Sequence, residues 1–107
     1  MSATIVQELN RLEQLYAAGF QDTFLNNALR KVIQRQIARD EADLAQIAES
    51  LTGFEKQFRL TSDDFWKKFQ SGQMTDTPDT MEWNVLCKMR QRILARLDIL
   101  RGVGEVD

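Results

Sequence analysis

Residues 25–58 read LNNALRKVIQRQIARDEADLAQIAESLTGFEKQF, and their apolar side chains recur with the seven-residue period of a coiled coil. The two inward positions of the heptad hold Arg30, Ile33, Ile37, Asp40, Leu44, Ile47, Leu51, Phe54 and Phe58. This repeat places one stripe along a helix and predicts a single helix over 22–58, about 50 Å long. The period stays in phase across Gly53, so we expect that glycine inside the helix. A helix of this length needs partner helices along both halves.

Two shorter helices are predicted on either side of the long one. Residues 4–18 place four apolar side chains on one stripe, namely Ile5, Leu9, Leu12 and Tyr16. Gly19 suits the end of that helix, and Asp22 suits the cap of the long one. Residues 62–71 follow Thr61 and carry two acids in the first turn, where the helix dipole favours them. These signals predict helices over 4–18 and 62–71.

A last helix is predicted over 78–101. Thr77 would cap it with Pro78 at its first position, although Asp79 and Glu82 also have the spacing of a capping box. On a helical wheel one arc holds Leu86, Met89, Ile93, Leu97 and Leu100, with Glu82 inside it. A second strip beside that arc holds Trp83, Cys87 and Leu94. We expect the arc to face the long helix and the strip to lack an internal partner.

Together these elements predict an all-α fold in one domain, residues 1–101, with a flexible tail over 102–107. The long helix and the last helix would form an antiparallel, coiled-coil-like hairpin, with the short helix at its connecting tip. The first helix would cover the other half of the long helix. Faces on the first helix and on the Trp83 strip stay uncovered in this arrangement, so we expect the chain to bundle as a homo-oligomer.

The composition of the 107 residues excludes several classes of protein. There is no His and one Cys, so the usual general base, the usual metal ligand and an internal disulfide are all missing. No apolar run is long enough to span a bilayer, and the first residues lack the features of a secretion signal. We therefore expect a cytoplasmic protein that is not an enzyme and uses no cofactor. The net charge of −2 indicates no particular partner.

Two polar groups sit where apolar residues are expected. Asp40 interrupts the stripe of the long helix, and a buried carboxylate there needs a cation. The antiparallel register offers Arg101, with Arg96 as the alternative. Glu82 on the buried arc needs donors, which backbone N–H groups of the turn could supply. Cys87 has no His to activate it and is expected to fill apolar space.

Charged residues cluster in three places. Asp76, Asp79 and Glu82 lie at a helix entry, where they would cap the helix or bind a hard cation. Two basic stripes run at helical spacing, one of Lys31, Arg35 and Arg39 and one of Lys88, Arg92 and Arg96. Solvated faces explain the stripes best, ahead of contact with an acidic surface and of nucleic-acid binding, because acids are interspersed elsewhere in the chain.

The connecting tip is unusually rich in large apolar side chains, namely Phe54, Phe58, Phe65, Trp66, Phe69, Met74, Met81 and Trp83. A tip with more aromatic residues than it can bury is typical of a protein-binding surface. The candidates for contacting a partner are Phe58, Phe65, Trp66, Phe69 and Trp83. The alternative is that all of them form a small core.

Residues 58–72, FRLTSDDFWKKFQSG, and the spacing of Met74, Asp76, Asp79, Glu82 and Trp83 resemble a group of small helical proteins. The group is common in cyanobacteria and other prokaryotes, and many members lie beside genes for toxins and look like antitoxin components. The resemblance covers residues 28–100 and implies a helical hairpin with an interaction role and no catalysis. It also implies a structural turn formed by Gly72, Asp76, Asp79, Glu82 and Trp83. Thr77, Pro78 and the added first helix depart from the group.

The sequence therefore predicts a non-catalytic interaction module. The first hypothesis is an antitoxin-like protein that sterically neutralises a partner encoded nearby. The second is a homo-oligomeric helical scaffold or adaptor. A nucleic-acid-binding regulator rests only on the two basic stripes, and no membrane contact is expected.

Overall fold

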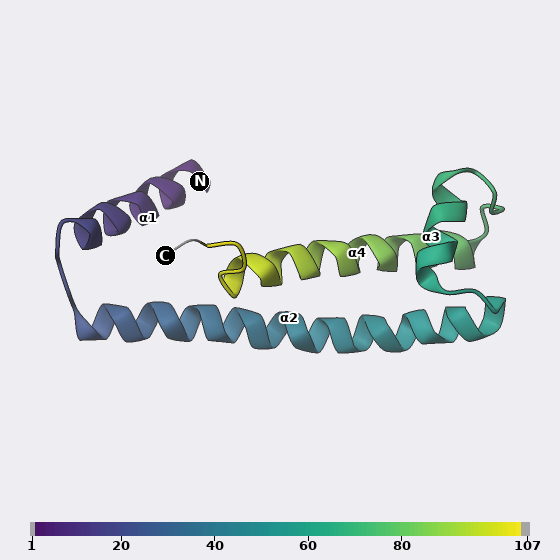
Figure 1. The fold of residues 1–107 in the computed structure, drawn as a ribbon, viewed down its shortest axis with the longest axis horizontal. Helices are drawn as coiled ribbons and strands as arrows, with labels where there is room; N and C mark the ends of the chain where they lie inside the picture. The colour runs from purple at the N-terminus through teal and green to yellow at the C-terminus, as the bar shows by residue number, and fades with distance from the viewer. Residues whose placement is uncertain (1, 106–107) are drawn as a thin grey trace. The chain divides into compact units, whose positions relative to one another are not determined.

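The computed structural model describes residues 2–105, with side chains from residue 4 onward, and within that range the fold is all-α. The helices are α1 (Ser2–Ala17), α2 (Thr23–Phe58), α3 (Ser62–Gln70) and α4 (Pro78–Leu100), as Figure 1 shows. The chain divides into two compact units, Met1–Val32 (unit 1) and Ile33–Asp107 (unit 2), where the sequence predicted one domain. The predicted helix boundaries agree with the observed ones to within two residues.

Unit 1 holds α1, a short turn and the first turns of α2. Gly19 adopts a positive φ of 102°, which ends α1 at low steric cost. Asp22 then caps α2, because its Oδ2 accepts a hydrogen bond of 2.7 Å from the backbone N–H of Leu25. The Tyr16 hydroxyl donates to Asn26 Oδ1 at 2.7 Å and so joins the two helices. The predicted turn at Gly19 and cap at Asp22 are confirmed.

Unit 2 is an antiparallel hairpin of α2 and α4, with α3 packed against α4 (Figure 1). Gln57 at the end of α2 bonds Asp79 at the start of α4, and Asp40 bonds Arg96 near the other end. Between these contacts lies one apolar core, made of Ile47, Leu51, Phe65, Trp83, Cys87, Ile93 and Leu97. The predicted hairpin is confirmed, and Gly53 lies inside α2.

Side chains fix the connection between α2 and α4. Thr61 caps α3, since its Oγ1 accepts from the backbone N–H of Asp64 at 3.1 Å. Glu55 reaches from α2 and accepts from the backbone N–H of Ser62 at 2.7 Å. Arg59, between the two helices, adopts the left-handed conformation with φ 52°. A non-glycine residue there is held by the turn around it at some cost in backbone strain.

The start of α4 is capped by threonines. Thr77 Oγ1 accepts from the backbone N–H of Thr80 at 3.1 Å, and Thr80 Oγ1 accepts from the backbone N–H of Thr77 at 2.8 Å. This reciprocal pair is a capping box with Pro78 at the first helical position. Thr77 is therefore the cap, and the alternative box of Asp79 and Glu82 is wrong. Beyond α4, Arg101 to Gly104 form turns, and residues 106 and 107 lie outside the described range.

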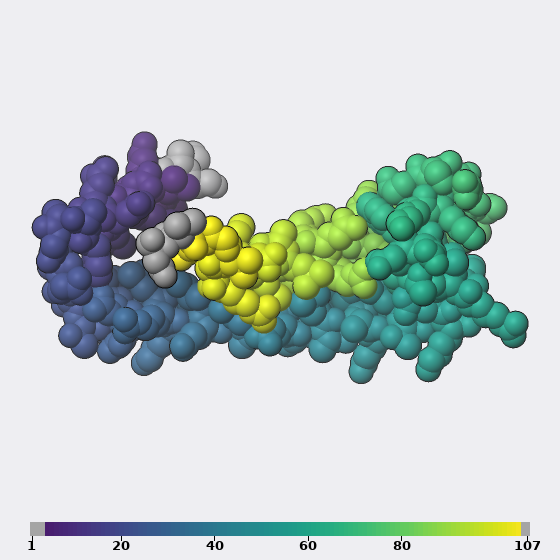
Figure 2. Space-filling model, in the orientation of Figure 1, coloured from purple at the N-terminus to yellow at the C-terminus, as the bar shows by residue number. Residues whose placement is uncertain are grey.

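The face of α4 that packs inward overlaps the predicted arc only in part. Ile93 and Leu97 of the arc are buried together with Trp83 and Cys87 of the strip, whereas Glu82 is exposed and Met89 keeps 40 % of its surface exposed. The prediction allowed for only one neighbour, but α3 covers the first half of α4 from another side. Figure 2 shows α3, the start of α4 and the end of α2 packed together without a visible gap. Trp83 and Cys87 of the strip thus have internal partners, whereas Leu94 is 46 % exposed, and Glu82 needs no buried donors.

Candidate interaction surfaces

The aromatic residues of the tip form a core. Trp83 and Phe65 are both 0 % exposed and stack with ring centroids 3.9 Å apart. Trp83 also lies against the rings of Phe54 and Phe58, and its Nε1 donates a 3.0 Å hydrogen bond to Ser62 Oγ. Trp83 therefore has a hydrogen-bond acceptor for its N–H and aromatic neighbours for its rings. The prediction that Phe65 and Trp83 contact a partner is wrong, because neither side chain reaches the surface.

Three other tip candidates, Phe58, Trp66 and Phe69, are half-buried against the same core. Phe69 lies beside Phe65 with ring centroids 5.4 Å apart. Each of the three still has some surface in reach of solvent. Their contact with a partner stays a prediction, but most of their apolar area is used inside unit 2.

The predicted structural turn separates into residues that shape it and residues that face solvent. Gly72 has a φ of 77°, and its N–H donates to the carbonyl of Phe69, which closes the end of α3. Asp79 Oδ2 accepts from Gln57 Nε2 at 3.1 Å. Asp76 and Glu82 are exposed. Among the side chains of residues 4–105, no three His, Cys, Asp or Glu residues lie together as a metal site would require.

Asp40 is the most constrained charged group of unit 2. Its carboxylate is buried and accepts two hydrogen bonds from Arg96, 2.8 Å from Nε and 2.6 Å from Nη2, and a third of 2.9 Å from Gln36. This bidentate pair lowers the pKa of Asp40 more than burial raises it, and Gln36 lowers it further. The same hydrogen bond raises the pKa of Arg96.

The sequence predicted Arg101 as the partner of Asp40, and this is wrong. Arg101 follows the last residue of α4 and instead pairs with Glu41, 3.4 Å from Nη2 to Oε1, at the surface. Arg96 lies more than a turn earlier, on the part of α4 that packs along Asp40. The alternative partner, Arg96, is therefore the observed one.

Cys87 lies inside the core of unit 2, only 2 % exposed. Burial raises the pKa of its thiol, and Arg90 offsets this only in part. A thiol with a raised pKa stays protonated at neutral pH and is a poor nucleophile. Cys87 therefore fills apolar space, as expected.

The hollows of the surface are shallow. One hollow of about 430 Å³ lies between the end of α2 and the start of α3 and is lined by Thr52, Glu55, Lys56, Arg59, Leu60 and Thr61. None of the groups with a shifted pKa borders it, and it opens widely to solvent. No helix within residues 2–105 is long and apolar enough to cross a bilayer.

Large exposed apolar side chains lie on α1, on the start of α2 (Phe24, 81 %, and Val32, 66 %) and on α4. In unit 1 they include Ile5 and Leu9, each 55 % exposed, on the predicted stripe of α1. In unit 2 they form a line along α4, where Met81, Val85 and Ile99 are 56 %, 53 % and 76 % exposed. Lys88 and Arg92 share that line at helical spacing, so we name Met81, Val85, Lys88, Arg92 and Ile99 the α4 stripe.

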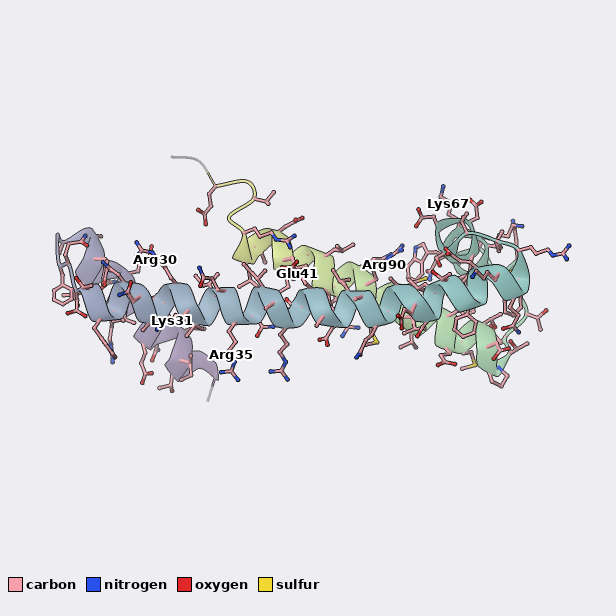
Figure 3. All side chains as sticks on the ribbon, turned by 90° about the horizontal axis from the view of Figure 1, so that it is seen from below. Arg30, Lys31, Arg35, Glu41, Lys67 and Arg90 are labelled. Atoms are coloured by element: carbon pink, nitrogen blue, oxygen red, sulfur yellow. The ribbon has the colours of Figure 1, made fainter. Side chains whose placement is uncertain are left out.

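The charges of α2 are segregated along its length. Residues 23–39 carry Arg30, Lys31, Arg35 and Arg39 without an acid, and residues 40–55 carry five acids without a base. In Figure 3, Arg30 lies on one side of α2, and Lys31 and Arg35 lie on the other. Two of the acids are paired, Asp40 with Arg96 of α4 and Glu41 with Arg101, which follows α4. Sequence reasoning noted the basic stripe but missed this division, which is readable in the residue order.

Comparison with known proteins gave no match, because no family model fits the sequence and no curated protein or solved structure is significantly similar. The resemblance carried by residues 58–83 therefore stays a prediction.

Proposed function

We propose that the chain is a non-catalytic protein-interaction module whose α4 stripe binds an acidic partner protein. The α4 stripe carries the proposal, because it keeps three large apolar side chains in solvent although unit 2 has a dry core beside them. Met81 and Val85 are four residues apart, a spacing that recurs where a helix is recognised through its apolar face. Ile99 lies on the same line 14 residues after Val85.

The charges on the α4 stripe define the chemistry of the partner. Lys88 and Arg92 lie between the apolar anchors, and neither belongs to an ion pair among the side chains of residues 4–105. A partner with an apolar strip bordered by Asp or Glu would complement both features. The partner would be held by its surface alone, so that binding neutralises it sterically, as an antitoxin does.

Co-expression of the chain with the product of its adjacent gene tests this proposal. We expect one co-eluting complex, which Val85→Glu disrupts because a carboxylate enters the apolar strip among the partner's acids. Gln46→Glu adds the same charge at an exposed position of α2, outside the α4 stripe, and should leave the complex intact. Independent elution of the two unmodified proteins, without rescue of growth, would contradict the antitoxin-like role.

A homo-oligomeric scaffold is the second candidate function. The open apolar stripe of α1 in unit 1 favours it, since this face lies on a different helix from the α4 stripe. The two candidates can therefore be tested separately.

A further inference from the structure

Unit 1 is too small to bury its own apolar side chains. It ends at Val32, and units shorter than roughly 40 residues usually need a disulfide, a metal or oligomerisation for stability. The only cysteine of the chain is Cys87, in unit 2, and the side chains from residue 4 onward form no metal cluster. Packing against a second copy of the chain is one way to cover the apolar stripe of α1.

A groove between α1 and α2 marks an uncovered part of the apolar stripe of α1. Its volume is about 220 Å³, and it is lined by Leu9, Leu12, Glu13, Tyr16 and Leu29, all within unit 1. Small-molecule sites usually measure roughly 300 Å³ or more. A groove of this size with an almost wholly apolar lining suits one or two side chains of another helix.

The charges beside the stripe of α1 indicate which helix that is. Glu8 and Glu13 are five residues apart, so they lie about 140° apart around the helix and border the stripe on opposite sides. Glu13 lines the groove next to Leu29 of its own α2. Glu8 therefore borders the other side, and no ion pair within residues 4–105 involves it.

A basic helix beside Glu8 would complement this second side. The chain itself carries one, because residues 23–39 of α2 have four bases and no acid. Arg30 lies on the side of α2 opposite Lys31 and Arg35 (Figure 3), so it is available to a helix arriving on that side. The acids at the border of the stripe would repel a nucleic acid or an anionic membrane.

We propose that unit 1 is a self-association surface, on which two copies of the chain pack their α1–α2 turns face to face as a four-helix bundle. In it, α1 of each copy lies on the first turns of α2 of the other. Leu9 enters the apolar interface, and Glu8 pairs with Arg30 of the second copy. This arrangement gives every helix two neighbours, as helix bundles require. The inference rests on the scaffold candidate and not on the α4 stripe.

Sedimentation equilibrium of the full chain between about 1 and 200 μM tests the inference. We expect a dimer for the unmodified chain and at least a tenfold weaker dimer for Leu9→Glu, since a carboxylate in an apolar interface lacks a partner. Gln7→Glu adds the same charge on the opposite side of α1 and should leave the dimer unchanged. Circular dichroism of each variant establishes that the helices are retained.

Charge reversal tests the pairing itself. Glu8→Lys and Arg30→Glu should each weaken the dimer several-fold, and the double variant should recover most of the affinity because the pair is restored with opposite polarity. Absence of recovery would overturn the pairing.

Two further results would overturn the inference as a whole. One is a monomer at every concentration, and the other is a dimer that Val85→Glu abolishes and Leu9→Glu does not. A monomer at every concentration does not bear on binding of an acidic partner at the α4 stripe, so failure of the inference and of the proposed function can be told apart. A dimer that only Val85→Glu abolishes would instead place self-association on the α4 stripe and count against both.

Discussion

The two units bury the apolar side chains of α2 to different extents. Ile47 and Leu51 in unit 2 are buried, whereas Leu29 in unit 1 keeps 38 % of its surface exposed. In unit 2, α4 lies along α2 and α3 lies across α4, so the core residues have neighbours on several sides. Within the described residues of unit 1, α2 packs against α1 alone. Burial therefore follows the number of neighbouring helices, and the apolar period alone does not determine it.

The largest expected effect is the loss of an aromatic side chain from the core of unit 2. Phe65→Ala removes a ring that stacks on Trp83 and should lower the free energy of unfolding by about 3–5 kcal/mol. Urea denaturation measured by circular dichroism checks this value. The matched control, Ile5→Ala in unit 1, should change it by less than about 0.5 kcal/mol at concentrations where the chain is monomeric. Equal effects in the two units would break the comparison.

The next effect concerns the buried pair of unit 2. The pKa of Asp40 is lowered in the folded state, so the stability it contributes is present above its unfolded pKa of roughly 4 and is lost as pH falls through the folded value. The urea concentration at the unfolding midpoint of the unmodified chain should therefore decrease as the pH is lowered below about 4.

Asp40→Asn should already lower the midpoint at neutral pH, because Arg96 loses its carboxylate, and should weaken the further fall in acid. Glu41→Gln alters the solvent-exposed pair with Arg101 and serves as the control with little effect. Parallel acid profiles for Asp40→Asn and the unmodified chain would show that Asp40 does not titrate as expected.

The smallest effect is a gain in stability. Arg59 holds a φ of 52°, a conformation that glycine adopts at no steric cost. Arg59→Gly should raise the free energy of unfolding of unit 2 by up to about 1 kcal/mol, measured by urea denaturation. Lys56→Gly, in the regular last turns of α2, is the control and should lower stability by about the same amount. A loss of stability in both variants would mean that Arg59 makes contacts that outweigh its strain.

Local signals made the helices predictable from the sequence. Gly19, Asp22, Thr61, Thr77 and Pro78 each mark a boundary through their own backbone preferences or caps, and these act over three or four residues. The coiled-coil period of α2 likewise identified Asp40 as a buried charge before any contact was known. Such features depend on neighbours in sequence, so no tertiary information was needed.

Contacts that depend on tertiary packing were predicted less well. The wheel left Trp83 uncovered, because a wheel cannot include the position of α3. The partner of Asp40 was placed at Arg101 because a register counted from the turn accumulates error along two helices. The aromatic tip was interpreted as a surface for the same reason, since its surplus of rings is used up where α2, α3 and α4 meet. The exposed face of α1 was expected from the pattern, but its groove and the position of Glu13 were not.

The reactivity of Cys87 can report on the opening of unit 2. It is the only thiol, it is buried, and its raised pKa suppresses the thiolate further. A thiol reagent can therefore modify the protein only in molecules whose unit 2 has opened. The rate of modification therefore reports on the opening of unit 2 without an added label. It does not report on unit 1, because that unit has no cysteine.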